Sequence, residues 1–220
     1  MEFSTLVILS IVVLTFLLVV VYLIDVNYFL RSGVVVLYAY FIRKPLGILE
    51  ESVVFARVLP FDADVLLTHM NNARCLREFD FGRLDFVVRC GLGKYYLWDS
   101  HQKQPLYAVA HVIRYRRPLH MFMKYKIVTK AVYWHDQIMY IQHKIVTLSD
   151  NIVRCIGYSK VIFPFRVEDF TGKCHPESVQ PEIPSDLQLW MNFIQANGLK
   201  SNRSRSGTET DAEQEEWLMS

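Results

Sequence analysis

The stretch from His69 to Gly93, HMNNARCLREFDFGRLDFVVRCGLG, predicts one long helix. It carries many charges and no proline, and its apolar residues recur at the spacing of a buried helix face. Gly91 and Gly93 are typical stop signals. We therefore expect a helix over residues 72–90 whose buried face comprises Leu76, Phe79, Leu84, Val87 and Val88.

Strand-like runs flank this helix on both sides. The run over residues 52–59 precedes it and ends at Pro60. Four more runs follow, joined by connectors short enough for antiparallel hairpins: residues 106–116, 121–134, 138–148 and 152–163. This order of elements predicts an α+β domain in which an antiparallel sheet of about five strands wraps around one long helix.

The run over residues 121–134 indicates that each strand buries one face. Tyr125 and Ile127 belong to its apolar side, whereas Lys124, Lys126 and Lys130 share the other side. One helix cannot cover so wide a sheet entirely. We therefore expect a second copy to pack alongside, which makes the protein a homodimer.

The composition sets limits on the class of protein. The 220 residues suffice for one domain with appendages, and the mean hydropathy of +0.17 is more apolar than a soluble average. The net charge of +2 gives no strong basic field, so nucleic acid is not expected as a partner. The four cysteines show no CxxC pair or metal spacing, and we expect reduced thiols, no metal and no cofactor.

Residues 6–24 form an uninterrupted apolar stretch, with no charge between Glu2 and Asp25. As a helix it would extend ~28 Å, close to the hydrocarbon thickness of a bilayer. The alternative is a cleaved signal peptide followed by secretion. The amino-terminal flank lacks a basic residue and no small-x-small cleavage site follows, so we expect an uncleaved transmembrane helix within an anchor and juxtamembrane segment, residues 1–45.

The basic residues after this stretch predict its orientation. Arg31, Arg43 and Lys44 all lie on the carboxyl side, so the positive-inside rule places the domain in the cytosol. We expect a single-pass protein, in the endoplasmic reticulum. A second apolar patch, residues 34–42, is too short to cross and either lies along the membrane or packs on the domain. The sequon at Asn202 tests the orientation, because a lumenal domain could be glycosylated there.

The predicted domain occupies residues 46–165. An extension over residues 166–198 follows, with several prolines and a short helix from Ser185 to Asn197. The tail over residues 199–220 is rich in Ser, Thr and Glu, and we expect it to be disordered.

A dense polar cluster lies in the turn before the long helix: Asp62, Asp64, His69, Asn71 and Asn72. The free amides at a helix start can polarise a carbonyl group, and a carboxylate can act as a base or a nucleophile. The alternative is ordinary helix capping, for which Asp and Asn are typical. The usual hydrolase, dehydrogenase and zinc motifs are absent from the sequence.

Asp62-x-Asp64 followed by the sequence HMNNAR at residues 69–74 resembles the DxD...GHVNNAxY signature of hotdog-fold acyl-CoA and acyl-ACP thioesterases. The resemblance covers residues 53–163. It implies a homodimer whose sheets join edge to edge, with acyl chains entering between helix and sheet at the subunit boundary. In the 4-hydroxybenzoyl-CoA branch the second Asp serves as nucleophile or base, while the helix start polarises the thioester carbonyl.

On this chain the resemblance assigns the carboxylate to Asp64 and the helix start to Asn71 and Asn72, within a catalytic cluster that includes Asp62 and His69. The chain departs from the signature in three ways: Thr68 replaces the glycine, one extra residue separates Asp64 from His69, and Cys75 replaces the aromatic residue. We expect Cys75 to be a small buried residue.

Arg114, Arg116 and Arg117 could bind CoA phosphates, since guanidinium groups fit phosphate oxygens; a solvated sheet face is the alternative. The leading hypothesis is a membrane-anchored thioesterase that hydrolyses a fatty acyl-CoA substrate. The altered spacing after Asp64 favours the alternative, a non-catalytic protein that binds acyl-CoA or lipid at the membrane.

Overall fold

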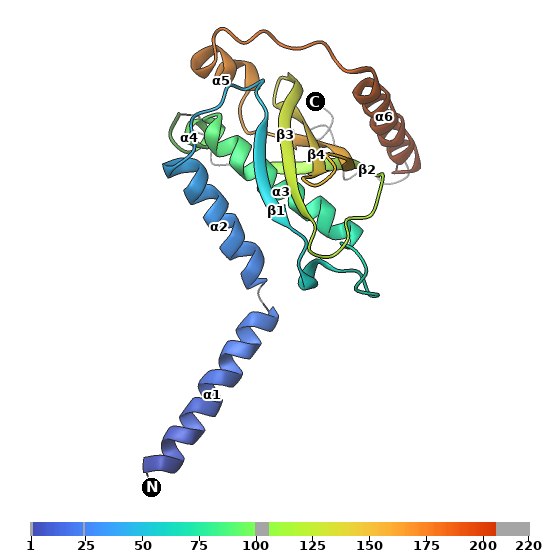
Figure 1. The fold of residues 1–220 in the computed structure, drawn as a ribbon. Coiled ribbons are helices and arrows are strands. Elements are labelled where there is room, and N and C mark those ends of the chain that lie inside the picture. The colour runs from blue at the N-terminus through green and yellow to red at the C-terminus, as the bar shows by residue number, and fades with distance from the viewer. Residues whose placement is uncertain (1, 24, 100–105, 206–220) are drawn as a thin grey trace.

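The computed structural model describes residues 2–23, 25–99 and 106–205, and its centre is a five-stranded antiparallel sheet (Figure 1). The strands lie in the order β1-β3-β4-β5-β2. Their bounds are β1 (Ser52–Arg57), β2 (Tyr107–Tyr115), β3 (Lys124–His135), β4 (Ile138–Thr147) and β5 (Val153–Ile162). The α+β fold class and the number of strands are confirmed.

The long helix α3 (Asn72–Arg89) packs against β1, β3 and β4. It approaches the sheet closely at Gly82, where a Cβ atom would collide with the hydroxyl of Thr129. Phe79 and Phe86 of this helix are fully buried. This is the hotdog arrangement, a curled sheet around one helix, that the resemblance implies.

The buried face of α3 differs from the prediction. Of the five apolar residues that we expected to face the core, only Phe79 is buried; the others are half-buried. Glu78 and Asp85 are buried instead. The reason is that a second helix and the residues just after it cover this side of α3 and supply partners for both carboxylates.

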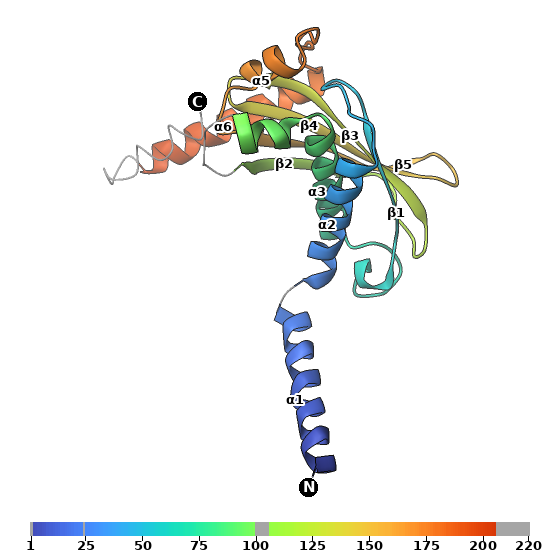
Figure 2. The same cartoon turned by 90° about the vertical axis from the view of Figure 1, so that its left-hand side faces the viewer.

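That second helix is α2 (Val26–Phe41), which lies along α3 in both ribbon views (Figures 1 and 2). Arg31 donates two hydrogen bonds to Glu78, at 2.5 and 2.6 Å. Arg43, just beyond the helix, donates to Asp85 at 3.0 Å. The second apolar patch therefore packs on the domain, and two of the three basic residues that predicted the orientation have acidic partners there.

The predicted hairpin between residues 106–116 and 121–134 is wrong. β2 pairs with β5 at one edge of the sheet, whereas β3 lies between β1 and β4. β1 occupies the side of β3 on which the predicted hairpin would have placed β2, and β2 pairs instead with the edge of β5. Residues 116–123 therefore cross the end of the sheet, and this crossover loop passes the start of α3.

The expected alternation in β3 is confirmed over its first half, where Tyr125, Ile127 and Ala131 are buried. An irregularity after Ala131 then shifts the register, so that Val132 and Trp134 are buried. The extra residue lets β3 bend around the helix.

The amino-terminal helix α1 (Glu2–Leu23) extends away from the domain (Figure 2). Its described side chains are exposed, including Leu6, Ile8 and Phe16. Among the described residues, no helix combines the length and apolar character needed to cross a membrane.

After β5 the chain forms α5 (Val167–Cys174) and α6 (Ser185–Arg205). Leu187 and Trp190 of α6 pack on Tyr140 and Tyr158, so α6 covers part of the outer sheet face. The helix predicted to end at Asn197 continues to Arg205, within the segment predicted to be disordered. The rest of that prediction, residues 206–220, lies outside the described residues.

Candidate functional site

Asp62 anchors the loop that joins β1 to α3. It lies in the 3₁₀ turn η1 (Pro60–Asp62) with 3% of its surface exposed, and its carboxylate accepts a hydrogen bond from the Leu59 N–H at 3.0 Å. Its carbonyl accepts from the Asn71 N–H at 2.8 Å, which ties the loop to the helix start. Burial raises the pKa of the Asp62 carboxyl group, with the Leu59 N–H opposing this effect. These contacts make Asp62 a structural support of the loop.

Asp64 holds together the turn that follows. Its Oδ1 accepts hydrogen bonds from the Thr68 N–H at 2.8 Å and the His69 N–H at 3.2 Å, and its own N–H donates to the His69 carbonyl at 2.8 Å. Desolvation raises the pKa of Asp64, but these N–H groups and the nearby His69 ring outweigh it and lower the pKa below its usual value. Asp64 is therefore an ionised acceptor at neutral pH.

The extra residue after Asp64 is accommodated by this turn. The Leu67 N–H donates to the Asp64 carbonyl at 3.0 Å, and Leu67 adopts a φ of +54°. A left-handed conformation is unfavourable for a side chain of this size, by about 1–2 kcal/mol. The turn thus keeps Asp64 close to His69, and the backbone at Leu67 is strained.

Thr68, at the position of the signature glycine, connects Asp64 with the histidine. Its Oγ1 lies 2.7 Å from His69 Nδ1 and 3.3 Å from both carboxylate oxygens of Asp64. The Asp64 carboxylate itself lies 3.6 Å from His69 Nδ1. A consistent assignment has Nδ1–H donating to Thr68 and the Thr68 hydroxyl donating to Asp64, which leaves Nε2 of His69 as a free base.

The start of α3 provides one unsatisfied amide. Asn71 caps the helix, with its Oδ1 accepting from the Ala73 N–H at 2.9 Å and its carbonyl accepting from the Arg74 N–H at 2.9 Å. No acceptor for the Asn72 N–H occurs among the described hydrogen bonds. This amide lies at the positive end of the helix dipole.

A cavity of about 250 Å³ opens where the helix start meets the crossover loop. Its walls come from the loop before α3, from α3, from the end of β2 with the crossover loop, and from β5; they include His69, Asn72, Cys75, Tyr115, Arg116, Arg117 and Cys155. His69 and Asn72 both line the cavity, whereas neither Asp62 nor Asp64 does. Asp64 reaches it only through Thr68 and His69.

Two of the three predicted arginines also line the cavity. Arg116 and Arg117 come from the crossover loop, and their backbone N–H groups both donate to the Arg154 carbonyl, at 2.8 and 3.3 Å. Arg114, on β2, does not line it. Of the three arginines predicted from the sequence, the cavity wall therefore contains the two in the crossover loop.

Sequence reasoning missed several residues of the cavity wall, among them Tyr115, Arg154 and Cys155. Tyr115 donates from its hydroxyl to the Asn72 carbonyl at 3.0 Å and so ties the end of β2 to the helix start. Arg154 is 7% exposed and held by Thr147. Cys155 faces Cys75, and a hydrogen bond with it, together with burial, raises the pKa of the Cys155 thiol. No local pattern distinguishes these residues, because only the strand order brings β2 and β5 to the helix start.

Cys75 is buried, as expected, with its Sγ 3.5 Å from Met70 Sδ. Within the described ranges, no group of three or more His, Cys, Asp or Glu side chains could hold a metal ion.

Comparison with known protein families shows to which family the chain belongs. The family described as the thioesterase-like superfamily matches residues 58–191, a range that includes the whole cavity. The chain belongs to the thioesterase-like superfamily. The resemblance of the DxD and HMNNAR motifs to this superfamily is thereby confirmed.

Curated proteins from three animals resemble the chain along most of its length. Protein THEM6 of Drosophila melanogaster is 34% identical over 191 residues, covering 86% of this chain and 97% of the relative. Protein THEM6 of Danio rerio is 34% identical, covering 84% and 90%. The Xenopus laevis protein of the same name is 31% identical, covering 88% and 92%.

Solved structures with thioesterase names are more distant. The DHNA-CoA thioesterase of Staphylococcus aureus has a TM-score of 0.48 and 15% identity, covering 57% of this chain and 87% of that one. The probable thioesterase YbaW of Escherichia coli has a TM-score of 0.45 and 18% identity, covering 50% and 80%.

Proposed function

We propose that this protein is a thioesterase that hydrolyses a fatty acyl thioester of the acyl-CoA type. The observation that carries the proposal is that His69, Asn72 at the start of α3 and two arginines line one cavity. A base, a carbonyl-polarising amide and cations for a phosphorylated leaving group are the parts that this reaction requires.

The proposed mechanism uses these groups in order. The Asn72 N–H, at the positive end of α3, stabilises the negative charge that develops on the thioester oxygen. His69 accepts a proton from a water molecule, whose oxygen attacks the carbonyl carbon. The C–S bond then breaks, and the departing thiolate receives the proton from the His69 ring, giving a carboxylic acid and a free thiol. Asp64, through Thr68, stabilises the protonated ring.

The assembly that we propose is a homodimer joined through β2. This strand is the edge of the sheet next to the cavity, and apolar side chains along it are exposed, including Tyr107, Val109 and Val112. An exposed apolar edge strand favours pairing with another chain. Since the cavity is small for a complete acyl-CoA, a second copy at this edge would extend the binding surface.

The test is turnover of the purified full-length chain on a panel of acyl-CoA esters. We expect His69→Gln to reduce kcat about 10²–10⁴-fold, as for the loss of a general base. Asp64→Asn should also reduce it, while Asp169→Asn, on the exposed surface of α5, should not. An Asp64→Asn variant with the unchanged rate of the parent would contradict the mechanism.

A second candidate function is non-catalytic binding of acyl-CoA or lipid. It is favoured by Asp64, which hydrogen-bonds to its own turn and does not line the cavity. Saturable binding of acyl-CoA without release of free thiol over hours would support this candidate, and measurable turnover would exclude it.

We further propose that residues 6–24 anchor the protein in the endoplasmic reticulum membrane, with the domain facing the cytosol. The support is the uncharged sequence between Glu2 and Asp25 and the exposed apolar side chains of α1. Retention in the membrane after alkaline extraction, with Asn202 unmodified, is the expected result. A mature protein that begins near Asp25, or a glycosylated Asn202, would favour secretion or a lumenal domain.

A further inference from the structure

Two loops at one end of the domain form a continuous structure around the candidate site. The loop before α3 and the crossover loop are joined by backbone hydrogen bonds from Met70 N–H to the Leu119 carbonyl, at 2.8 Å, and from Phe122 N–H to the Val58 carbonyl, at 3.0 Å. His69 and His120 also form an isolated β-bridge. The same loops supply the cavity with His69 and Leu119.

The tips of these loops carry large apolar side chains into solvent. We call this set the apolar rim: Phe61 (46% exposed), Val65 (94%), Leu66 (76%), Leu67 (67%) and Phe122 (59%). Two of its members have positive φ angles, +54° at Leu67 and +63° at Phe122. Bulky residues rarely adopt this conformation. Packing within the domain does not account for the apolar rim, because all five of its side chains are exposed to solvent.

Cations border the apolar rim. Arg57 of β1 and Lys124 of β3 are exposed and lie directly opposite each other in the strand pairing, at the sheet end that carries Phe122. Like charges in this position destabilise a sheet unless an anion lies between them. Neither residue has an ion-pair partner among the described side chains. Exposed Arg116 and Arg117 of the crossover loop add positive charge to the same end.

The acidic groups of this region do not neutralise these cations. Asp62 is buried, and Asp64 accepts hydrogen bonds from its own turn. The surface therefore combines protruding apolar tips with a cationic border. Proteins that bind the interface of an anionic bilayer show this combination, since the apolar groups enter the acyl boundary and the cations meet the headgroups.

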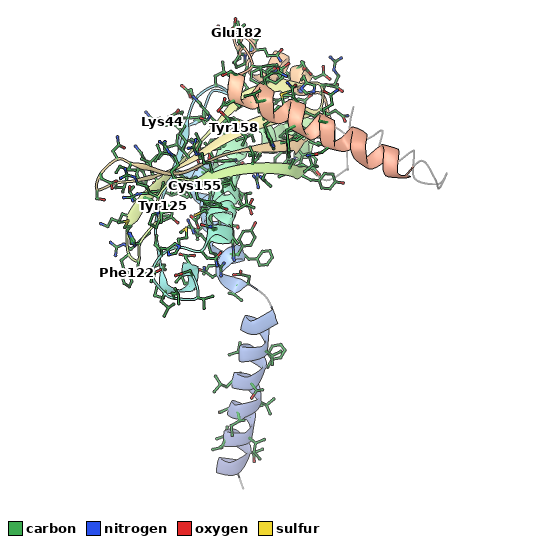
Figure 3. All side chains as sticks on the ribbon, turned by 90° about the vertical axis from the view of Figure 1, so that its right-hand side faces the viewer. Lys44, Phe122, Tyr125, Cys155, Tyr158 and Glu182 are labelled. Carbon is green, nitrogen blue, oxygen red and sulfur yellow. The ribbon has the colours of Figure 1, made fainter. Side chains whose placement is uncertain are left out.

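The position of the apolar rim agrees with this kind of partner. Figure 3 shows Phe122 at the end of the domain from which α1 extends, and Figures 1 and 2 show the loop containing η1 at the same end. The connection between α5 and α6 lies at the other end, where Figure 3 labels Glu182. A bilayer that received α1 would thus meet the apolar rim as well.

We propose that the apolar rim inserts into the interfacial region of an anionic phospholipid bilayer, with Arg57 and Lys124 at the headgroups. This is a second lipid contact, separate from residues 6–24. Because the same two loops line the cavity, the contact places the cavity entrance at the lipid surface. Its consequence, delivery of acyl substrates from the membrane, rests on the proposed function.

The test places a tryptophan on the apolar rim of the full-length chain, reconstituted into vesicles of equal parts phosphatidylcholine and phosphatidylserine. Leu66→Trp is compared with Val179→Trp, whose position is 80% exposed in the α5–α6 connection. We expect the emission added by Leu66→Trp to shift to shorter wavelength and to be quenched by brominated acyl chains. The emission added by Val179→Trp should show neither change.

The charge requirement is tested in the Leu66→Trp background. Combining Arg57→Gln with Lys124→Gln should remove the extra quenching that phosphatidylserine produces over pure phosphatidylcholine. The matched control combines Lys44→Gln with Lys94→Gln, two exposed lysines away from the apolar rim, and should retain it.

Three outcomes overturn the inference. If the chain enters vesicles but Leu66→Trp is not quenched, the apolar rim does not contact lipid, while the proposed anchor and hydrolysis stand. If its emission shifts without lipid and depends on protein concentration, a second copy covers the apolar rim instead. If the chain does not associate with vesicles at all, the proposed anchor fails together with the apolar-rim contact, and thioester hydrolysis is tested separately in solution.

Discussion

The hydroxyl oxygen of Thr68 lies 2.7 Å from Nδ1 of His69. The same oxygen lies 3.3 Å from both carboxylate oxygens of Asp64. Glycine, which the thioesterase signature has at this position, could not make this connection. Thr68 thus connects the Asp64 carboxylate with the His69 ring that lines the cavity, although one extra residue separates Asp64 from His69.

Replacing Thr68 with valine should lower kcat for acyl-CoA hydrolysis about 10-fold, since the loss of a group that orients a functional histidine commonly has this effect. KM should change little, because Thr68 does not line the cavity. Thr68→Ser, which keeps the hydroxyl, should retain the parental kcat. Equal rates for the valine and serine variants would rule out the link.

Arg116→Gln combined with Arg117→Gln should raise KM for acyl-CoA about 10-fold, as expected for the loss of hydrogen bonds to a charged group. A thioester of N-acetylcysteamine lacks phosphates, and its KM should be unchanged. Arg114→Gln is the matched control, because Arg114 lies close in sequence but outside the cavity wall. A similar effect on both substrates would show that the arginines do not recognise phosphate.

Arg31→Met should reduce the free energy of unfolding by about 3 kcal/mol, because Glu78 would be left buried and unpaired. The Glu78 side chain is 3% exposed. Adding Glu78→Met should restore most of the loss, while Arg74→Met, opposite the exposed Asp25, should cost less than about 1 kcal/mol. Urea unfolding of the full-length chain in detergent measures the free energy of unfolding of all three variants. If the double variant loses as much stability as Arg31→Met alone, the Arg31–Glu78 pair does not stabilise the domain.

Acidification should destabilise the domain through His143. Its ring is fully buried, stacks on Phe79 with centroids 4.6 Å apart, and has no partner for Nε2. Burial lowers its pKa well below the usual value, with Arg83 and His111 contributing. The unfolded chain therefore takes up this proton first, so the stability is present above about pH 6.5 and is lost as the pH falls below it.

Thermal unfolding between pH 7.5 and 5.5, a range around the usual pKa of about 6.5, measures this effect. His143→Gln should flatten the decline of Tm with pH, whereas His120→Gln, at an exposed position, should leave the slope unchanged. A His143→Gln variant with the parental slope would place the acid sensitivity elsewhere.

The strands and the long helix were predictable because their signals are local. Alternation in residues 121–134 and helical spacing after Asn72 each depend on neighbours within a few positions, and the observed elements agree closely with them. The cluster before the helix was predictable for the same reason, since its residues are adjacent in sequence.

The burial of Glu78 and Asp85 could not be read from the helix alone. Charged residues normally indicate a solvated face. They are buried here because α2 supplies Arg31 and the segment just after α2 supplies Arg43, both more than thirty positions earlier in the chain. An amphipathic pattern identifies apolar contacts, whereas a buried ion pair depends on a partner that only the packing of two helices provides.

The amino-acid sequence by itself determined the class of fold, the five strands, the helix and the pair of motifs that mark the superfamily, because each depends on local spacing. Only the tertiary structure decided the order of the strands. With β1 beside β3, β2 is left to pair with β5, and the crossover loop must pass the start of α3. That passage brings Arg116, Arg117 and Tyr115 to His69 and Asn72, and it determines which side chains can meet a substrate.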